Sequence, residues 1–176
     1  MPANSAGSHS YREGFSLVEL MVVVCISIIF AGLALPSFAN LIQQVRLIAI
    51  AHELRSTIQL TRAEAIKRNG YVDLTAVNGN WENGWRMKSA ENDQILIHAP
   101  IHKNFKIEAK FTDGVQHIAY NGTGHSRVAK NSQAALSGHI LISIGAHTRL
   151  IVVNFLGNVR ICNPASDKSC ISNSLD

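Results

Sequence analysis

The sequence lacks the short motifs that mark the commonest classes of enzyme. It contains no P-loop, no Gly-x-Gly-x-x-Gly fingerprint and no nucleophile elbow. Its eight histidines are scattered, and Pro100 between His98 and His102 argues against the helix that would bring that pair together on a metal. No spacing of serines and histidines defines a catalytic triad. We therefore predict no catalytic residue, no metal site and no cofactor, and we expect that the chain is not an enzyme.

Cysteine is scarce, with three in 176 residues. Two cysteines without a second Cys or His pair at ligand spacing make a poor zinc site. Cys25 lies in a long apolar segment, where we expect it to behave as a small buried hydrophobe. Cys162 and Cys170 flank Asn163 and Pro164, which suit a turn. If this part of the chain lies outside the cytoplasm, a disulfide between the two cysteines is expected to close the loop.

Charge is almost absent from one long segment near the N-terminus. From Phe15 to Leu35 the only charged residue is Glu19. At about 1.5 Å per helical residue this segment would be roughly 31 Å long, which is enough to cross a bilayer core. A carboxylate inside such a segment costs on the order of 2.5–3.5 kcal/mol on insertion scales. We therefore expect another group to compensate the charge of Glu19.

Two simpler interpretations of this segment stay open. A secretory signal peptide has an apolar core of about 7–15 residues and a small-residue cleavage site, for which Ser37-Phe38-Ala39 could pass. The apolar run is too long for that, and the acid inside it is atypical. An ordinary signal anchor could carry Glu19 by chance at its helix N-terminus, where the helix dipole favours negative charge. That interpretation leaves the Gly14–Phe15 junction and the position of the acid unexplained.

Glycine and proline are absent from Asn40 to Arg68, which favours a helix. Apolar residues recur there at steps of 3, 4 or 7 and predict an amphipathic helix with one buried stripe. The stripe consists of Leu47, Ala51, Leu54, Ile58 and Ala65. Asn69-Gly70 then supplies a stop signal. Together with the apolar run, the pattern predicts one long helix from Phe15 to Arg68.

After Gly70 the periodicity changes to that of strands. Asn78-Gly79-Asn80 predicts a hairpin turn between strands at Tyr71–Val77 and Trp81–Met87. Trp81 and Trp85 are expected to pack this region against the helix. Further strand candidates are Gln94–His98, Lys106–Phe111, Val115–Tyr120, His139–Ile144, Arg149–Phe155 and Asn158–Cys162. The fold class predicted is α+β, with a long N-terminal helix packed on an antiparallel β-rich globular head.

Five stretches of the sequence resemble those of the type IV pilin superfamily. They are Gly14–Val23, Ala34–Phe38, Leu60–Arg68, Trp81–Trp85 and Phe155–Arg160. Within the superfamily the chain is most similar to the minor pseudopilins of the secretion protein H (GspH) and FimT family.

The resemblance implies a processing site. In that family a prepilin peptidase cuts after a glycine and N-methylates the new first residue, so Gly14 and Phe15 would flank the cleavage and Phe15 would carry the methyl group. Glu19 would then meet the free amine of a neighbouring subunit's Phe15 during assembly. The pairing of a new ammonium group with this carboxylate would offset two desolvation costs at once.

The resemblance also implies an organisation of the chain and its partners. The segments would be a leader peptide (1–14), a transmembrane and assembly half of the helix (15–39), an amphipathic half (40–68) and a periplasmic head (69–176). The protein would cross the bacterial inner membrane once and later enter a filament. Its partners would be other pilins or pseudopilins, the prepilin peptidase and the inner-membrane assembly platform. Both a type II secretion pseudopilus and a type IV pilus stay open.

An alternative function concerns the C-terminal third, where basic residues outnumber acidic ones. Some FimT-type members bind DNA for natural transformation through a Gly-Arg-x-Arg motif. Gly157-Asn158-Val159-Arg160 corresponds to it here, with asparagine in place of the first arginine. The candidate DNA-contacting residues are Arg149, Arg160 and Lys168, which would bind in a salt-sensitive manner. The simpler interpretation is that these are solvated surface charges.

Overall fold

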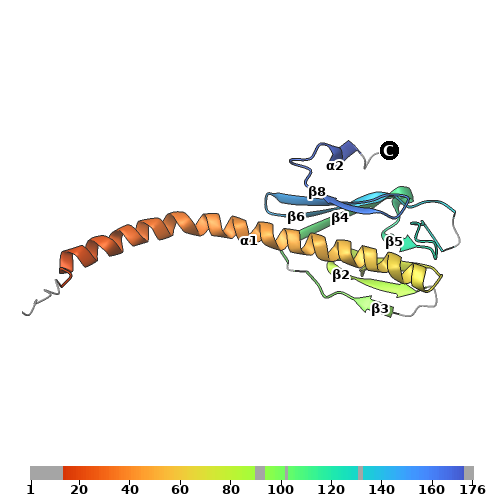
Figure 1. The fold of residues 1–176 in the computed structure, drawn as a ribbon, viewed down its shortest axis with the longest axis horizontal. Coiled ribbons are helices and arrows are strands. Elements are labelled where there is room, and N and C mark those ends of the chain that lie inside the picture. Colours follow the sequence, from red (N-terminus) through yellow and green to blue (C-terminus); the bar gives the residue numbers. More distant parts are fainter. Residues whose placement is uncertain (1–13, 90–93, 102, 131–132, 173–176) are drawn as a thin grey trace, which may run out of the picture. The chain divides into compact units, whose positions relative to one another are not determined.

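The computed structural model describes residues 14–89, 94–101, 103–130 and 133–172. The chain divides into two compact units, Met1–Asn40 and Leu41–Asp176, and each is described by itself. All strands found among the described residues belong to the second unit (Figure 1).

Helix α1 (Leu17–Lys67) runs through both units. Its C-terminal end is fixed by local backbone geometry. Asn69 has a φ of 47°, and the amides of Asn69 and Gly70 bond to the carbonyls of Ile66 and Ala65, each at 3.0 Å. This pair of hydrogen bonds is a Schellman motif, which satisfies carbonyls that the helix leaves without partners. The stop predicted at Asn69-Gly70 is confirmed.

The first sheet contains four antiparallel strands in the order β3-β2-β1-β5. They are β1 (Val72–Val77), β2 (Asn80–Ser89), β3 (Gln94–Ile97) and β5 (His117–Tyr120). Asn78 and Gly79 connect β1 to β2 with φ values of 54° and 75°. Positive φ at both positions is what a type I′ turn requires, so the hairpin predicted at this site is confirmed.

The second sheet is also antiparallel, in the order β4-β6-β7-β8. Its strands are β4 (Phe105–Phe111), β6 (Gly138–Ile144), β7 (His147–Val153) and β8 (Val159–Cys162). A 3-10 turn, η1 (Thr112–Gly114), follows β4, and a short helix, α2 (Ser169–Ser172), follows β8. The chain therefore leaves the first sheet after β3, returns to it for β5, and completes the second sheet afterwards.

The second unit has one main core, which the C-terminal half of α1 forms with both sheets (Figure 1). The helix contributes a stripe of fully buried side chains: Leu47, Ala51, Leu54, Ile58 and Ala65. The strands contribute Leu74, Trp85, Ile107, Ile118, Ile140, Ile142 and Ile151, among others. The predicted amphipathic stripe is confirmed, and so is the α+β class with a helix packed on antiparallel sheets.

The apolar N-terminal part of α1 is exposed in the first unit. Its large side chains from Leu17 to Phe30 are each about half or more accessible to solvent. Cys25 is exposed as well. The expectation that Cys25 is buried is wrong for the single chain, because no described residue of this unit covers the helix. Among the described residues, no helix has both the length and the hydropathy needed to cross a membrane.

Candidate functional site

The predicted processing site lies just ahead of α1 and is open. A Cβ atom built on Gly14 would meet no atom within 4 Å. The side chain of Phe15 is 83% exposed. Within the first unit, the two residues that flank the predicted cleavage are therefore both open to solvent.

Glu19 and Ser16 cap the first turn of α1. The amide of Ser16 donates to Glu19 Oε2 at 2.9 Å, and the amide of Glu19 donates to Ser16 Oγ at 3.2 Å. These reciprocal bonds form a capping box. The sequence contains the signal for a capping box, Ser-x-x-Glu before an apolar run, although the predictions from sequence did not include this cap. Glu19 therefore has a local role in addition to the one that the family resemblance implies.

The capping box uses only one of the two carboxylate oxygens of Glu19, Oε2. Among the described residues, Oε1 of Glu19 accepts no hydrogen bond, and the side chain is exposed. The carboxylate lies at the N-terminal end of the helix, where the partial positive charge of the helix dipole attracts it. An acid oriented in this way can accept a further cationic donor without giving up the cap.

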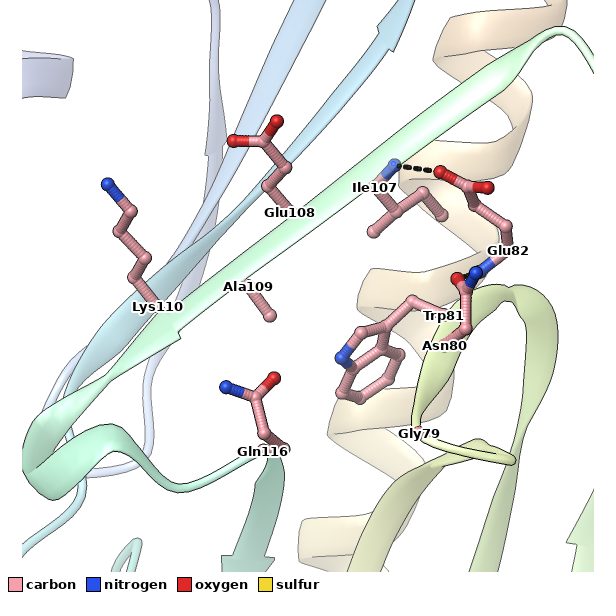
Figure 2. Close-up of a pocket in the computed structure, with 9 residues that line it drawn as sticks. All are labelled: Gly79, Asn80, Trp81, Glu82, Ile107, Glu108, Ala109, Lys110 and Gln116. Atoms are coloured by element: carbon pink, nitrogen blue, oxygen red, sulfur yellow. Dashed lines mark hydrogen bonds between the residues drawn. The ribbon is translucent and has the colours of Figure 1, made fainter.

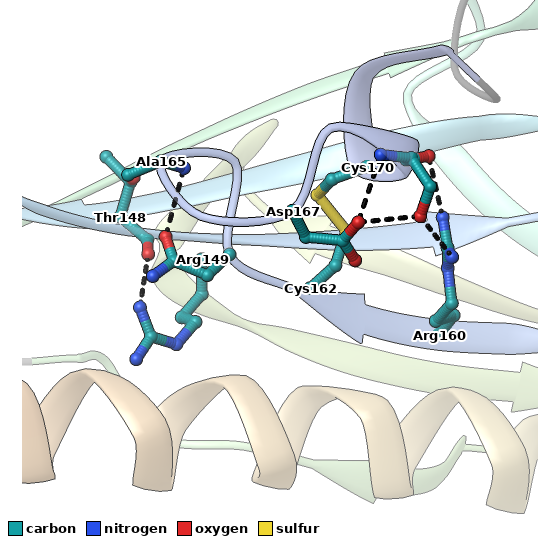
Figure 3. The surroundings of a disulfide bond; sticks show 9 residues. Thr148, Arg149, Arg160, Cys162, Ala165, Asp167 and Cys170 are labelled. Carbon is teal, nitrogen blue, oxygen red and sulfur yellow. Dashed lines mark hydrogen bonds between the residues drawn. A yellow bond between two sulfur atoms is a disulfide. The ribbon is translucent and has the colours of Figure 1, made fainter.

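The C-terminal cysteines form a disulfide, Cys162–Cys170, with their Cα atoms 5.8 Å apart. Cys170 is fully buried and packs with Leu150 and Val152 in a small second core. Figure 3 shows how the loop closed by the disulfide lies over β8. The loop thus covers the face of the second sheet that α1 leaves free.

Arg160 is held against this loop. Its guanidinium donates to Ser169 Oγ at 3.1 Å and to Ser169 O at 3.0 Å (Figure 3). Asp167 accepts from the amide and hydroxyl of Ser169. Those hydrogen bonds, together with the charge of Arg160, hold the pKa of Asp167 below its usual range. Lys168 lies between Asp167 and Ser169 and is exposed. Arg160 therefore bonds the residue that follows Lys168 in the chain, and its charge acts on Asp167.

Arg149 lies elsewhere. It pairs in register with Ile142, whereas Arg160 pairs with Val152. Since side chains alternate between the two faces of a strand, Arg149 and Val152 project from opposite faces of the second sheet. Arg149 donates to the carbonyl of Thr148 at 2.7 Å, and Figure 3 shows it well apart from Arg160. The three predicted DNA-contacting residues do not form one patch.

The turn that corresponds to Gly-Arg-x-Arg is held by two arginines of α1. Arg62 donates to Gly157 O at 3.3 Å and to Asn158 Oδ1 at 3.1 Å, and Arg55 donates to Val159 O at 3.4 Å. An arginine at position 158 would place a second cation beside Arg62. The asparagine instead accepts a hydrogen bond from it.

Gly157 is required at this turn. Its φ is 81°, and a Cβ atom there would lie 2.6 Å from Gly124 O and 2.7 Å from Tyr120 Cε1. Tyr120 donates its hydroxyl to Gly157 O at 3.3 Å, and burial raises the pKa of this phenol well above its usual range. The sequence prediction did not identify Arg55, Arg62 or Tyr120, since their partners lie about 40 to 100 residues away along the chain.

The Trp81-x-x-Gly84-Trp85 stretch joins β2 to α1 and to the segment after β3. Trp85 donates its indole N–H to Thr57 Oγ1 at 3.3 Å, and the ring of His98 stacks on it with centroids 4.0 Å apart. Gly84 has a φ of 92°, and a Cβ there would collide with the carbonyl oxygen of His98. The glycine therefore permits the close approach of residue 98, and the prediction that Trp85 packs against the helix is confirmed.

The described residues hold no group of three or more His, Cys, Asp or Glu side chains arranged to bind a metal ion. His102, one member of the pair considered from the sequence, lies outside the described residues.

Three solved chains match this fold, and two of them have a TM-score above 0.5. The type IV minor pilin FimU of Pseudomonas aeruginosa matches with a TM-score of 0.54 at 16% identity, over 70% of this chain and 93% of that one. The minor pseudopilin EpsH from the type 2 secretion system of Vibrio cholerae matches with a TM-score of 0.51 at 10% identity, over 69% and 99%. At these identities the likeness concerns the fold alone.

Sequence comparison identifies the family. No curated protein is similar enough in sequence to count as a match. The family model for type II transport protein GspH matches residues 50–157, which is more than half of the chain. This family is structural rather than enzymatic, which supports the prediction that the chain is not an enzyme. The chain belongs to the GspH family and is a minor pilin-like protein of the GspH/FimT type.

Proposed function

We propose that this protein is a structural subunit of a type II secretion pseudopilus or a type IV pilus, and that it works by assembling with other pilins. The observation that carries the proposal is the N-terminal site. An exposed apolar helix begins with an acid whose Oε1 atom has no partner among the described residues. Exposure of such an apolar surface to water is unfavourable, whereas packing against similar helices would bury it.

Processing is the first proposed step. A prepilin peptidase would cut between Gly14 and Phe15 and methylate the new terminus, and the exposure of both residues supports this. Cleavage creates an ammonium group at Phe15, two residues before α1 begins at Leu17. The methyl group would leave its positive charge in place.

Assembly is the second proposed step. The Phe15 ammonium of one subunit would donate to Glu19 Oε1 of its neighbour, while Oε2 keeps the bond to Ser16. Each of the two charges is costly in an apolar surrounding, and pairing them offsets part of that cost. The acid would thus favour packing with a neighbour over a solitary helix.

The proposed location before assembly is the bacterial inner membrane, with the apolar segment that begins at Phe15 as the anchor and the head in the periplasm. The Cys162–Cys170 disulfide supports the extracytoplasmic side for the head, because disulfides persist in oxidising compartments. The assembly platform of the membrane would then move the subunit into the filament. The solved relatives include one subunit of each machine, and the proposal covers both.

The test replaces Glu19 by alanine and uses Ser16→Ala as a matched control. Both variants lose the capping box, but only Glu19→Ala loses the acid. We expect both to be processed, as shown by mass spectrometry of an N-methylated Phe15 terminus. We expect Ser16→Ala to co-purify with the sheared filaments and Glu19→Ala to be largely lost from them.

Equal recovery of the two variants in the filament would contradict the assembly role of Glu19. Retention of residues 1–14 in cells with an active peptidase would contradict the processing step.

A second candidate function is DNA binding by a FimT-type minor pilin in natural transformation. The observation in its favour is that Arg160 on β8 and Lys168 in the loop after it are both exposed, and that Arg160 bonds Ser169, the residue next to Lys168. Retardation of duplex DNA at low salt by the wild-type chain, lost in the Arg160→Gln/Lys168→Gln double variant, would support it. Because Arg160 is bonded to Ser169 and Arg149 lies on the other face, we expect little retardation by the wild type.

A further inference from the structure

A cavity of about 480 Å³ lies beside β4, at the end of the β1–β2 hairpin. The residues that matter for its chemistry are Trp81, Glu82, Ala109 and Gln116 (Figure 2). Its volume falls within the range of about 300–1,000 Å³ typical of ligand sites. Neither the processing site nor the C-terminal loop uses it.

One wall of the cavity is an open strand edge. β4 is the first strand of its sheet and pairs on one side only, with β6. The amide of Ile107 donates to Glu82 Oε1 at 3.2 Å, so it points away from β6. In an antiparallel ladder the outward direction recurs at every second residue, so the N–H and C=O of Ala109 point outward as well. No described residue bonds to that pair.

The opposite wall carries a buried donor without a partner. Trp81 is 3% exposed, and its Nε1 atom has no hydrogen-bond partner among the described residues. Figure 2 shows the indole nitrogen facing the space between Ala109 and Gln116. The neighbouring tryptophan, Trp85, has its N–H satisfied by Thr57. A buried donor left unpaired is uncommon and is costly to the fold.

The inner face of β4 also leaves room at this point. Phe105, Ile107 and Phe111 are bulky and buried on that face. Ala109 occupies the same face between Ile107 and Phe111 with a single methyl group. The missing volume lies beside the indole, which allows one small apolar side chain to enter.

We propose that this cavity binds a short extended segment of another protein chain, which adds to β4 as an outer strand. The segment accepts from the Ala109 amide, donates to the Ala109 carbonyl, and offers a further carbonyl to Trp81 Nε1–H. Alternating main-chain donors and acceptors are what such strand addition recognises. The Glu82 carboxylate already occupies the Ile107 amide and so ends the added strand there. The inference does not depend on the proposed filament role.

The test is a titration of the ¹⁵N-labelled full chain in detergent micelles. Its two tryptophans give two indole N–H signals, which Trp81→Phe assigns. The probe is the capped peptide acetyl-Val-Thr-Val-Thr-amide, and its control is the same peptide with every backbone amide N-methylated. We expect the probe to move the Trp81 indole and Ala109 amide signals in a saturable manner. The Trp85 signal should stay in place, and the methylated peptide should have no effect.

Three variants localise the binding. Trp81→Phe and Ala109→Pro each remove one donor and should weaken binding about three- to tenfold, measured at the signal that each retains. Proline is tolerated where an edge-strand amide faces outward, and Trp81→Phe decides alone if Ala109→Pro does not fold. Trp85→Phe is the matched control, because it removes a donor that is already bonded within the chain, and it should leave binding unchanged.

Three outcomes would overturn the proposal. The first is no saturable shift of the Trp81 signal up to about 10 mM peptide, where even a site with a Kd of about 1 mM is largely filled. The second is an equal response to the N-methylated peptide. The third is a Trp81 signal that is already hydrogen-bonded in the chain alone and insensitive to peptide, since the chain's own residues would then fill the cavity.

Discussion

At the residue scale, the second unit contains a histidine whose charge state affects folding. His139 lies on β6 opposite Lys110 of β4. Its Nδ1 atom is buried and has no partner among the described residues. Burial, and secondarily the charge of Lys110, lower the pKa of this imidazole below its ordinary value of 6.5. The folded state therefore binds the proton less readily than the unfolded state does.

This difference predicts the direction of a pH effect. As the pH falls through the unfolded-state pKa, the unfolded chain gains a proton that the folded chain resists, so the free energy of unfolding decreases. We expect urea unfolding to show a smaller loss of stability from about pH 7.5 to about pH 5 in His139→Gln than in the wild type. Lys110→Gln removes only the second cause and should fall between them. Parallel pH profiles for the wild type and His139→Gln would rule out this coupling.

Single residues also show why the capping box was predictable and the C-terminal turn was not. Ser16 and Glu19 lie three positions apart, so a short local motif is enough to predict the cap. Arg62 and Asn158 are 96 positions apart, and nothing local to either residue indicates its partner. From sequence alone, the charges of the Gly157-to-Arg160 stretch can be identified, but its hydrogen-bond partners cannot.

At the scale of elements, the disulfide loop is the part whose stability can be isolated. Cys162 and Cys170 are separated by 8 positions, and closing a loop of this size stabilises a fold by about 2–3 kcal/mol in the chain-entropy model. In a Cys25→Ser background, we expect Cys162→Ser/Cys170→Ser to lower the free energy of unfolding by about that amount, measured by urea denaturation.

Reductant provides the control for this prediction. It should shift the urea midpoint of the disulfide-containing chain toward that of the double variant, and it should leave the double variant unchanged. A midpoint that does not respond to reductant would mean that the bond contributes nothing to the fold.

Elements with a strong local period were predicted correctly. The buried stripe of α1 follows from spacing alone, and the β1–β2 hairpin follows from Asn78 and Gly79. The division into two sheets was not predicted, since it depends on pairings between distant segments. Leu74 pairs with Ile118, and Ile107 pairs with Ile142. The alternation of apolar and polar residues predicts which face of a strand is buried, but it does not predict which other strand pairs with it.

At the scale of the whole molecule, the two compact units differ in what they bury. The main core draws every one of its residues from Leu47 onward, so the second unit holds its own core. The first unit leaves its large apolar side chains exposed. This predicts that Leu41–Asp176 folds alone when produced in an oxidising compartment.

The fragment should melt in one cooperative transition by far-UV circular dichroism. Its midpoint should lie within a few degrees of that of the full chain in detergent, because no core residue has been removed. A broad, non-cooperative melt would show that the first forty residues are needed to fold the rest.

The capping box described above has a consequence for maturation. The proposed cleavage would break the peptide bond that precedes Phe15, whereas the cap relies on the amide of the following peptide, at Ser16. Trimming the precursor would therefore leave the opening turn of the helix already wound. The mature subunit would need no local rewinding before it joins its neighbours, and the acid would be held in place from the moment its counter-charge appears.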